Sequence, residues 1–439
     1  MTDILTNVLA FAFALGVIIF VHESGHLMMA KAFGVRVLTF SLGFGKSLWG
    51  FRRGETEYRV SALPLGGYVR LGGENAEEAT GDPREFVSKP RWQRVLVYLA
   101  GPLMNVVLAI VLFAGLFMVG IAVPNLPGIP SVVGAVEPGS SAAKAGLQRG
   151  DRIVAAKGEP VTSWKDLGFA LLTSPGQPVA LVVERGATRF NATVTPVRDP
   201  KYAVGDSAGI YPSIRPQVTE ILPNSPAAAA GFRTGDEIRA VDGRPIADSQ
   251  DFVAYVDKRA GQRIDIQVVR DAVLLTVPVT PRNQDGHGRI GVGIGFFQRY
   301  GPRRALIESL KYNVQIVQET FRMIGKVFTR EISARAAFAG PVEIAAQSGA
   351  AARTGFKFLL HLMGFISISI AILNLMPIPI LDGGQIFILL IEVLIRRDLS
   401  LRLKEVVSQV GFVLILLLMF VVIWFDVSKH LPASLLPGS

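Results

Sequence analysis

The sequence predicts a polytopic α-helical membrane protein that also carries two small β-rich domains. Half of the 439 residues are hydrophobic, only 18% are charged, and four apolar stretches are each long enough to cross a bilayer. Soluble globular chains carry about 25% charged residues, so this deficit favours membrane spans and argues against disorder. The chain contains no cysteine, which excludes a thiol nucleophile, a disulfide scaffold and an iron–sulfur cluster.

Each apolar stretch has about the 20 residues that a transmembrane helix needs. The four stretches are Ile4–Val21, Val95–Val123, Phe358–Leu381 and Val406–Phe425. The first has no basic segment before it and continues into Val21-His22-Glu23 in place of a small-residue cleavage site. It is therefore expected to be a membrane span and not a cleavable signal peptide.

The basic residues predict how the chain is oriented in the membrane. Segment 34–92 holds nine of them, and the loop after the third span adds Arg396, Arg397, Arg402 and Lys404. By the positive-inside rule both loops face the cytoplasm, so both termini and the long segment 124–357 are expected on the other side. The net charge of +10 is then explained by membrane orientation, and no nucleic-acid partner is expected.

The segment after the second span contains an internal repeat at an offset of 85 residues. Residues 146–153 (GLQRGDRI) match residues 231–238 (GFRTGDEI), and flanking positions match as well. Two copies with short β-rich runs predict two small compact domains. The pattern resembles the PDZ family in its circularly permuted bacterial form, whose members bind extended peptides at an open sheet edge.

Peptide binding is expected at the glycine-rich motif of each copy, although a purely structural role for the repeat is the alternative. The residues concerned are Gly146, Leu147, Gly150, Gly231, Phe232 and Gly235.

Segment 301–355 is predicted to be helical and amphipathic. Apolar residues from Leu306 to Phe328 recur at spacings of three and four, and basic residues flank them. We expect this apolar face to pack on a neighbouring domain; the alternative is a helix that lies on the membrane surface.

A candidate metal site lies in the first span, at His22-Glu23-Ser24-Gly25-His26. On a helix the two histidines lie one turn apart on one face, where both imidazoles can bind one metal ion. Glu23 projects nearby and could act as a general base. Ionisable residues inside a membrane span are costly and tend to be functional, which favours this interpretation over helix capping or pore lining.

A catalytic zinc usually has three protein ligands, so one more is needed. Asp382 is the best candidate, because it follows a segment that Pro377 and Pro379 prevent from forming a regular helix. Irregular backbone at membrane depth is tolerated where it is buried in protein or lines a wet cavity. Glu392 is the rival, but it lies nearer the charged inner end and is expected to extend its head group to the interface.

Helix geometry places three polar residues in one layer. At about 1.5 Å per residue, His26 and Asp382 lie roughly 15–20 Å from the cytoplasmic ends of their spans, and Asn105 of the second span lies at a similar depth. Segment Thr56–Gly73 alternates polar and apolar residues on both sides of Pro64-Leu65-Gly66-Gly67, which predicts a β-hairpin that turns there.

Together these motifs resemble the site-2 proteases, which are intramembrane zinc metalloproteases. The similarity is greatest to the bacterial type with tandem PDZ domains that regulates the sigma-E envelope stress response. It covers nearly the whole chain: HExxH in the first span, GPxxN in the second, two PDZ domains, and NxxPxPxLDG in the third span. Gln385 follows this last motif where some relatives have histidine, a difference that affects only local contacts.

The resemblance implies a zinc endopeptidase with one Zn²⁺ per chain. His22, His26 and Asp382 would bind zinc, and Glu23 would be the general base. The hairpin would re-enter the membrane from the cytoplasmic side and pair with the substrate strand; the alternative is an ordinary cytoplasmic hairpin. Substrate-side positions would be Asn374, Asn105, Pro377, Pro379, Gly67, Tyr68 and Val69.

The resemblance also implies an inner-membrane protein with periplasmic termini and periplasmic PDZ domains. Its partners would be the lipid bilayer and single-span membrane proteins, such as an anti-sigma factor already cut outside the membrane, or remnant signal peptides. The PDZ domains would filter substrates by size or bind their new ends. Two rivals need no proteolysis: a PDZ scaffold in the membrane, and a metal-ion transporter.

The expected organisation is listed here by residue number. It comprises span one (1–33), a cytoplasmic-side loop with the hairpin (34–92), span two (93–123), the first PDZ domain (127–212), the second PDZ domain (213–298), the amphipathic segment (301–355), span three (356–395), span four (405–428) and a short periplasmic tail (429–439).

Overall fold

The computed structural model describes residues 2–74, 80–122, 129–199, 204–295, 297–329 and 339–430. The chain divides into two compact units. The first comprises Met1–Met118, Gly301–Gly325 and Phe338–Ser439, and the second comprises Val119–Tyr300 and Lys326–Ala337. The predicted tail 429–439 lies almost wholly outside the described residues.

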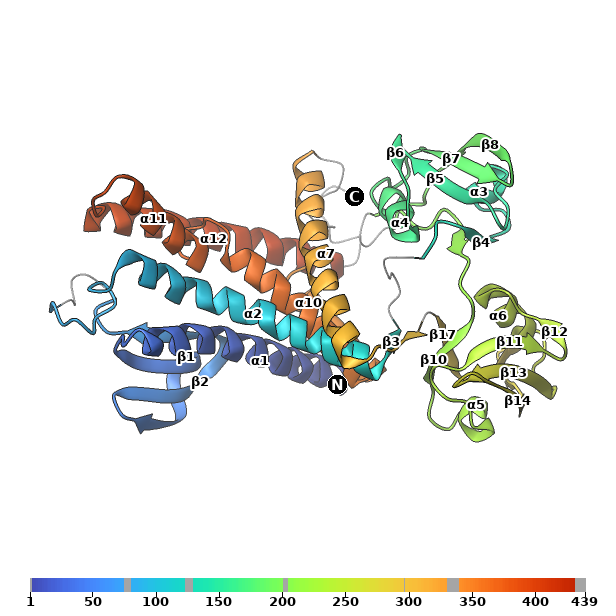
Figure 1. Ribbon diagram of the computed structural model, residues 1–439, viewed down its shortest axis with the longest axis horizontal. Helices are drawn as coiled ribbons and strands as arrows, with labels where there is room; N and C mark the ends of the chain where they lie inside the picture. The colour runs from blue at the N-terminus through green and yellow to red at the C-terminus, as the bar shows by residue number, and fades with distance from the viewer. Residues whose placement is uncertain are drawn as a thin grey trace. The chain divides into compact units, whose positions relative to one another are not determined.

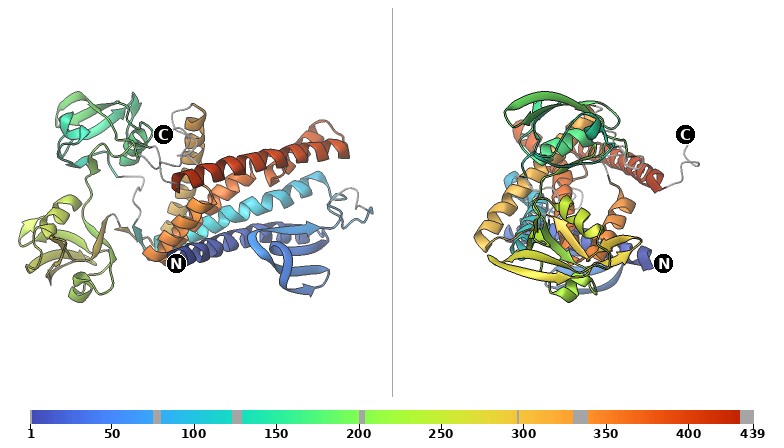
Figure 2. Two further views of the ribbon diagram at one scale, coloured as in Figure 1. Left: turned by 180° about the vertical axis from the view of Figure 1, so that it is seen from behind. Right: turned by 90° about the vertical axis from the view of Figure 1, so that its right-hand side faces the viewer.

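Among the described residues, four helices are long and apolar enough to span a membrane. They are α1 (Thr2–Ala32), α2 (Arg91–Val119), α10 (Phe356–Asn374) and α12 (Leu401–His430). They overlap the four predicted stretches and run alongside one another (Figures 1 and 2). Most large apolar side chains of α12 are exposed, among them Leu414 and Leu417, as expected for a helix whose solvent is lipid.

The third span is broken, as its prolines predict. Helix α10 ends at Asn374, and α11 (Asp382–Leu394) begins after an irregular loop. The loop lies so close to α11 that a Cβ on Gly384 would come within 2.1 Å of the Ile378 carbonyl oxygen. Gln385 donates a hydrogen bond from Nε2 to the carbonyl of Pro379 (2.6 Å), so its effect is local, as expected.

Segment 34–92 does contain a β-hairpin, and the chain reverses direction at Pro64–Gly67 as predicted, but the strands on the two sides of that reversal do not pair with each other. The two strands are β1 (Val37–Arg53) and β2 (Thr56–Leu71), so the tight turn lies at Gly54-Glu55. Residues 37–42 of β1 lie between the two halves of β2, because Leu42 pairs with both Val60 and Gly67. Strand 47–53 pairs only with residues 56–61 and therefore forms the outer strand of this bent sheet.

The amphipathic segment forms two helices, α7 (Pro302–Phe328) and α9 (Pro341–Thr354). The predicted apolar face of α7 is only partly packed: Leu306, Leu310 and Val314 are about half exposed, whereas Val317 and Phe321 line a pocket against α2 and α10. A smaller, more polar face of α7 is also packed against the spans. Ser309 donates a hydrogen bond to the Ile110 carbonyl of α2 (2.7 Å). The exposed part of the apolar face is therefore available to lipid, because the α2 residue beside α7, Ile110, belongs to the second apolar stretch.

The second unit contains the two predicted repeats. In the first, the described strands are β4 (Val133–Val136), β5 (Arg152–Ala156), β6 (Glu159–Pro160), β7 (Val179–Arg185), β8 (Thr188–Val194) and β9 (Ile210–Pro212), with α3 (Ser141–Lys144) and α4 (Trp164–Leu172). The order of hydrogen-bonded strands is β6-β5-β7-β8, and β4 pairs with β9.

In the second repeat the strands are β10 (Gln217–Ile221), β11 (Glu237–Val241), β12 (Arg244–Pro245), β13 (Ile264–Arg270), β14 (Val273–Val279), β15 (Arg282–Gln284), β16 (His287–Arg289) and β17 (Val292–Gly295), with α5 (Pro226–Ala230) and α6 (Ser249–Asp257). The order is β14-β13-β11-β10-β17, so β17 is an edge strand. Two short strands, β3 (Ile121–Ala122) and β18 (Phe297–Gln298), pair with each other at the ends of the unit.

Each copy contains an equivalent ion pair between a buried aspartate and an arginine, which explains why the repeat preserves both residues. Arg185 donates to both carboxylate oxygens of Asp151 (2.7 and 2.8 Å). Arg270 and Asp236 repeat this contact (2.7 and 2.7 Å). Each arginine also donates to the carbonyl of a motif glycine, Gly146 or Gly231, and so ties the glycine-rich turn to the sheet.

Candidate metal centre and active site

Three candidate ligands from two helices meet at membrane depth. His22 and His26 come from α1, one turn apart, and Asp382 is the first residue of α11. The Nε2 atoms of the two histidines are 3.2 Å apart. Each also lies close to a carboxylate oxygen of Asp382, at 3.3 Å from His22 and 3.5 Å from His26.

These separations fit a tetrahedral zinc ion. Bonds of about 2.0–2.1 Å to such an ion place its ligand atoms about 3.3 Å apart. Among the described residues this is the one group of three or more His, Asp or Glu side chains with ligand atoms close enough to hold a metal. Two imidazoles and one carboxylate leave a fourth position for water or substrate, as catalytic zinc sites require.

The second span fixes the orientation of both imidazoles. The Nδ1 atom of His26 lies 2.8 Å from the Val97 carbonyl, so Nδ1 carries the proton and Nε2 is free to bind a metal. The side chain of Asn105 lies 3.2 Å from Nδ1 of His22 and is fully buried. Its Oδ1 atom has no partner. A flipped amide would let Oδ1 accept the Nδ1 proton of His22, which leaves Nε2 of that ring for the metal as well.

Glycines allow α1 and α2 to approach closely enough for these contacts. A Cβ on Gly101 would lie 2.2 Å from Nε2 of His26, and one on Gly25 would lie 2.3 Å from the Ala100 carbonyl oxygen. The roles of Gly25 and Gly101 were not predicted. Gly101 is the glycine of the GPxxN motif, but only the helix packing shows that this glycine makes room for an imidazole.

The β-sheet of segment 34–92 reaches the same site. A Cβ on Gly67 would lie 3.0 Å from Cγ of Glu23 and 2.8 Å from Cγ2 of Ile19, so β2 passes directly against α1. The next residue, Tyr68, accepts a hydrogen bond from Arg59. Residues 67–71 pair with β1 on one side only, so their other edge has no strand partner among the described residues.

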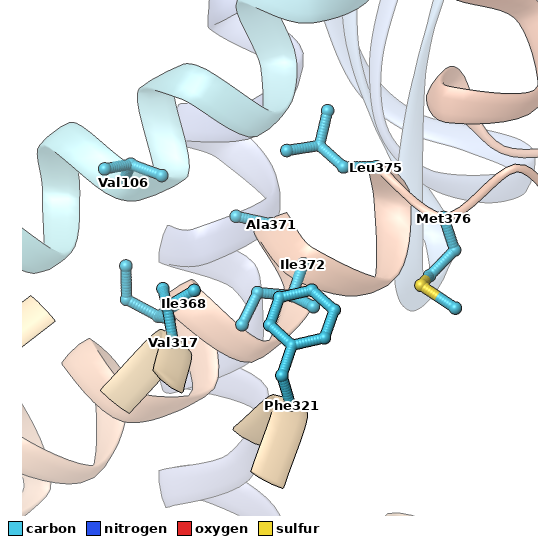
Figure 3. A pocket seen from close by; sticks show the side chains of 8 residues that line it. All are labelled: Val106, Val317, Phe321, Ile368, Ala371, Ile372, Leu375 and Met376. Carbon is cyan, nitrogen blue, oxygen red and sulfur yellow. The ribbon is translucent and has the colours of Figure 1, made fainter. Parts of the chain in front are cut away.

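An apolar cavity of about 200 Å³ lies behind the site, between α2, α7 and α10 (Figure 3). Val106 and Ile368, which line it, follow Asn105 and Ser367 in sequence. Ser367 donates a hydrogen bond to the Asn105 carbonyl (2.8 Å), so α10 braces the α2 residue that contacts His22. Leu375 and Met376, at the start of the proline-rich loop, complete one wall of the cavity.

Three predicted substrate-side residues lie near the site in sequence, without a hydrogen bond to it in the described structure. Asn374 is the last residue of α10, and Pro377 and Pro379 lie in the loop between α10 and α11. Val69 is half-buried in β2, two residues beyond Gly67. Their roles in substrate binding stay predictions.

The expectation that Glu392 extends to the interface is wrong. Its side chain is fully buried and lies 2.6 Å from Nζ of Lys404. One carboxylate oxygen also accepts a hydrogen bond from the Leu399 backbone (2.9 Å). A buried carboxylate is stable only when it is paired, and the start of α12 supplies the partner.

The predicted PDZ peptide-binding residues occupy structural positions. The side chains of Leu147 and Phe232 are 4% and 5% exposed and belong to the hydrophobic cores of their domains. The four motif glycines, Gly146, Gly150, Gly231 and Gly235, all have positive φ and form left-handed turns. A peptide could not contact the two apolar side chains without opening the domain, so any contact at this motif would use its backbone, and the peptide-binding role of these six residues stays a prediction.

Comparison with known proteins agrees with this geometry. The model of peptidase family M50 matches residues 10–418. The regulator of sigma E protease of Salmonella typhi is 33% identical over 457 residues, which cover 98% of this chain and 100% of that protein. The regulator of sigma-E protease RseP of Escherichia coli K12 is 31% identical over 460 residues, with the same coverage.

A crystal structure of a PDZ domain from an SdrC-like protein of Listeria monocytogenes aligns with 18% of this chain and 85% of its own length, at 23% identity and a TM-score of 0.17. The family match spans most of the chain, including both histidines and Asp382. The chain therefore belongs to peptidase family M50, and it is an intramembrane zinc metalloprotease.

Proposed function

We propose that this protease cleaves single-span membrane proteins inside the bilayer, with His22, His26 and Asp382 as zinc ligands and Glu23 as the general base. One observation carries the proposal: the three ligand atoms converge at tetrahedral spacing between a transmembrane helix and the broken third span. A membrane scaffold or a metal-ion transporter would not require Glu23, the carboxylate that directly follows His22.

The chemistry divides between the metal and the chain. Zinc, when bound, would polarise the scissile carbonyl and lower the pKa of the attacking water. Glu23 follows His22 on α1 and projects beside the histidines, where it would accept the proton from that water and deliver it to the leaving amine. Val97 and Asn105 keep the imidazoles in the tautomer that the ligand role requires.

The free edge of residues 67–71 is the proposed binding site for the cleaved segment. A transmembrane helix hides its amides, so it must be extended before a protease can cut it. An extended peptide could pair with this edge, and the contact of Gly67 with Glu23 would bring its backbone to the general base. Gly67, Tyr68 and Val69 would then be the substrate-pairing residues, and Asn374 would contact the peptide near the scissile bond.

The proposed topology follows the basic residues. Segment 34–92 and the loop after the third span would face the cytoplasm, and the sheet of β1 and β2 would enter the inner membrane from that side. Both termini and the two PDZ-like domains would be periplasmic. Glu23 lies nine residues before the end of α1, about 14 Å from its inner end, which suits release of a cytoplasmic fragment.

The relatives named as regulators of sigma E suggest the substrate class. An anti-sigma factor, shortened outside the membrane by a first protease, would be the main substrate, and remnant signal peptides would be a second class. The PDZ-like domains would exclude uncut substrates by size or bind their new ends. Because Leu147 and Phe232 are buried, we assign peptide binding to the edge strands β9 and β17, each preceded by a left-handed glycine, Gly209 or Gly291.

The test is cleavage of a single-span model substrate by the full-length protein reconstituted with zinc. Glu23→Gln should abolish cleavage and retain zinc, because Glu23 is not a ligand, whereas Asp382→Asn should lose both. Glu159→Gln, on an exposed strand of the first PDZ-like domain, is the matched control. Cleavage retained by Glu23→Gln would refute the mechanism, and zinc content unchanged in Asp382→Asn would refute the third ligand.

A further inference from the structure

The outer strand of the β1–β2 sheet has an unusual surface for a protein exposed to water. All residues from Phe44 to Arg53 are exposed. Leu48 is 69% exposed, Trp49 64% and Phe51 50%. The strand ends in two arginines, Arg52 and Arg53, whose side chains form no ion pair or hydrogen bond within the described part of the chain. Tryptophan beside basic residues is typical of segments at a membrane interface.

The nearby acidic residues are already paired with other arginines. Glu55, in the turn of the hairpin, lies 3.1 Å from Arg84. Glu57, which pairs with Arg52 across the sheet, lies 3.9 Å from the guanidinium of Arg59. The two arginines at the end of the outer strand are therefore available to bind an anion from outside the described chain.

The strand register relates this surface to the depth of α1. Tyr58 accepts a hydrogen bond from Lys31 (2.6 Å), in the last turn of α1, so Tyr58 lies level with the inner end of the first span. Phe51 pairs with Tyr58, and the two arginines follow it toward the hairpin turn. These arginines therefore lie at the level of Lys31 or outside it, where lipid headgroups are found.

In the other direction the outer strand extends toward the depth of the active site. Trp49 pairs with Val60, and Val60 and Gly67 both pair with Leu42. Because Gly67 contacts Glu23, Trp49 lies at about the level of the general base. The apolar end of the strand is thus at hydrocarbon depth, and its cationic end is at headgroup depth.

We propose that residues 48–53 form a membrane anchor that binds anionic phospholipid. Arg52 and Arg53 bind the headgroup phosphates, for which the planar guanidinium is suited, and Leu48, Trp49 and Phe51 insert among the acyl chains. The sheet then has two distinct edges. Residues 67–71 lie against the active site, and the strand at the opposite edge holds the sheet in the bilayer.

The absence of cysteine allows a site-specific probe. Ser47→Cys, at the start of the outer strand, would introduce the sole thiol of the chain for an environment-sensitive fluorophore. The full-length labelled protein is placed in nanodiscs of phosphatidylcholine, with or without phosphatidylglycerol, and brominated acyl chains report contact by quenching. Both faces of a nanodisc have the same lipids, so the result does not depend on the proposed topology or on proteolytic activity.

We expect phosphatidylglycerol to increase quenching, and high salt to reverse the increase. Each interfacial cation contributes about a fivefold preference for an anionic surface, so Arg52→Gln/Arg53→Gln should lower the ratio of inserted to free strand by roughly thirtyfold. Arg52→Lys/Arg53→Lys keeps both charges and should retain most of the effect. Arg396→Gln/Arg397→Gln makes the same charge change in another exposed loop and should leave quenching unchanged.

Zinc content checks that each variant is folded. Equal quenching with and without phosphatidylglycerol would refute headgroup binding. Dependence on phosphatidylglycerol that persists in the double glutamine variant would refute the assignment to these arginines. Absence of quenching in every lipid would refute insertion of the strand altogether.

Discussion

A single methyl group at Gly101 should distort the metal site and leave the helix intact. A Cβ at this position would lie 2.2 Å from Nε2 of His26 and 2.9 Å from Cε1 of His22. Non-bonded carbon atoms prefer separations of about 3.5–4.0 Å, so in Gly101→Ala the His26 ring must move by more than about 1 Å. The atom displaced most is the nitrogen that would bind zinc.

A misplacement of about 1 Å can cost on the order of 100-fold in rate, and we expect Gly101→Ala to lower cleavage by at least that factor. Zinc affinity should fall by at least the 10- to 100-fold typical of lost supporting contacts. Alanine favours a helix by up to about 1 kcal/mol over glycine, so α2 itself should not be weakened.

The assay combines cleavage of a single-span substrate with zinc content and chelator competition on the same preparations. Gly115→Ala is the matched control, because it lies on the same helix and its Cβ would meet no atom within 4 Å. The reasoning would be refuted if Gly101→Ala retained wild-type zinc affinity and rate, since the imidazole could not then lie over this glycine.

Three further changes test contacts around the site and in the repeats. Asn105→Leu removes the partner of a ligand histidine and should weaken zinc binding by about 10- to 100-fold in chelator competition; unchanged affinity would show that another group orients the ring. Arg270→Met leaves the Asp236 carboxylate, which is 1% exposed, without its bidentate partner. It should destabilise the second PDZ-like domain by about 2–3 kcal/mol, seen as faster hydrogen exchange in β11 and β13 but not in α2. In the first domain, burial acts to raise the pKa of Asp151, but the hydrogen bonds from Arg185 hold this pKa below its ordinary 3.8. The stabilisation from this pair is therefore present above about pH 4 and is lost as the pH falls further, so hydrogen exchange in β5 and β7 should accelerate only on acidification; acceleration between pH 5 and 7 would contradict this assignment.

The sequence predicted the membrane spans because a span is a local property of composition. About 20 consecutive apolar residues are enough to identify a membrane-crossing helix wherever it packs. The His22–His26 spacing is local too, since four residues make about one helical turn. The repeat was visible because both copies preserve the same turn glycines and the same Asp–Arg pair.

The errors arose where pairing depends on distant residues. Alternation in Thr56–Leu71 identified β structure but could not show that residues 37–42 lie between its two halves. Periodicity in α7 identified an apolar face, yet in a membrane protein such a face can point to lipid while a polar one packs inside. Glu392 could not be assigned correctly from its own segment, because its partner Lys404 lies on the next helix.

The sequence alone determined that this chain has four helices long and apolar enough to cross a membrane, and it predicted a histidine pair, an acid and an asparagine at one depth, because composition and helical pitch are read along the chain. Only the tertiary structure decided which atoms meet. Asn105 and His22 are 83 positions apart, and Asp382 is farther still from both histidines. Their convergence depends on Gly25 and Gly101, which let two helices approach closely, and on the broken third span. How closely two helices approach depends on the packing between them, and this packing leaves no periodic pattern in the sequence.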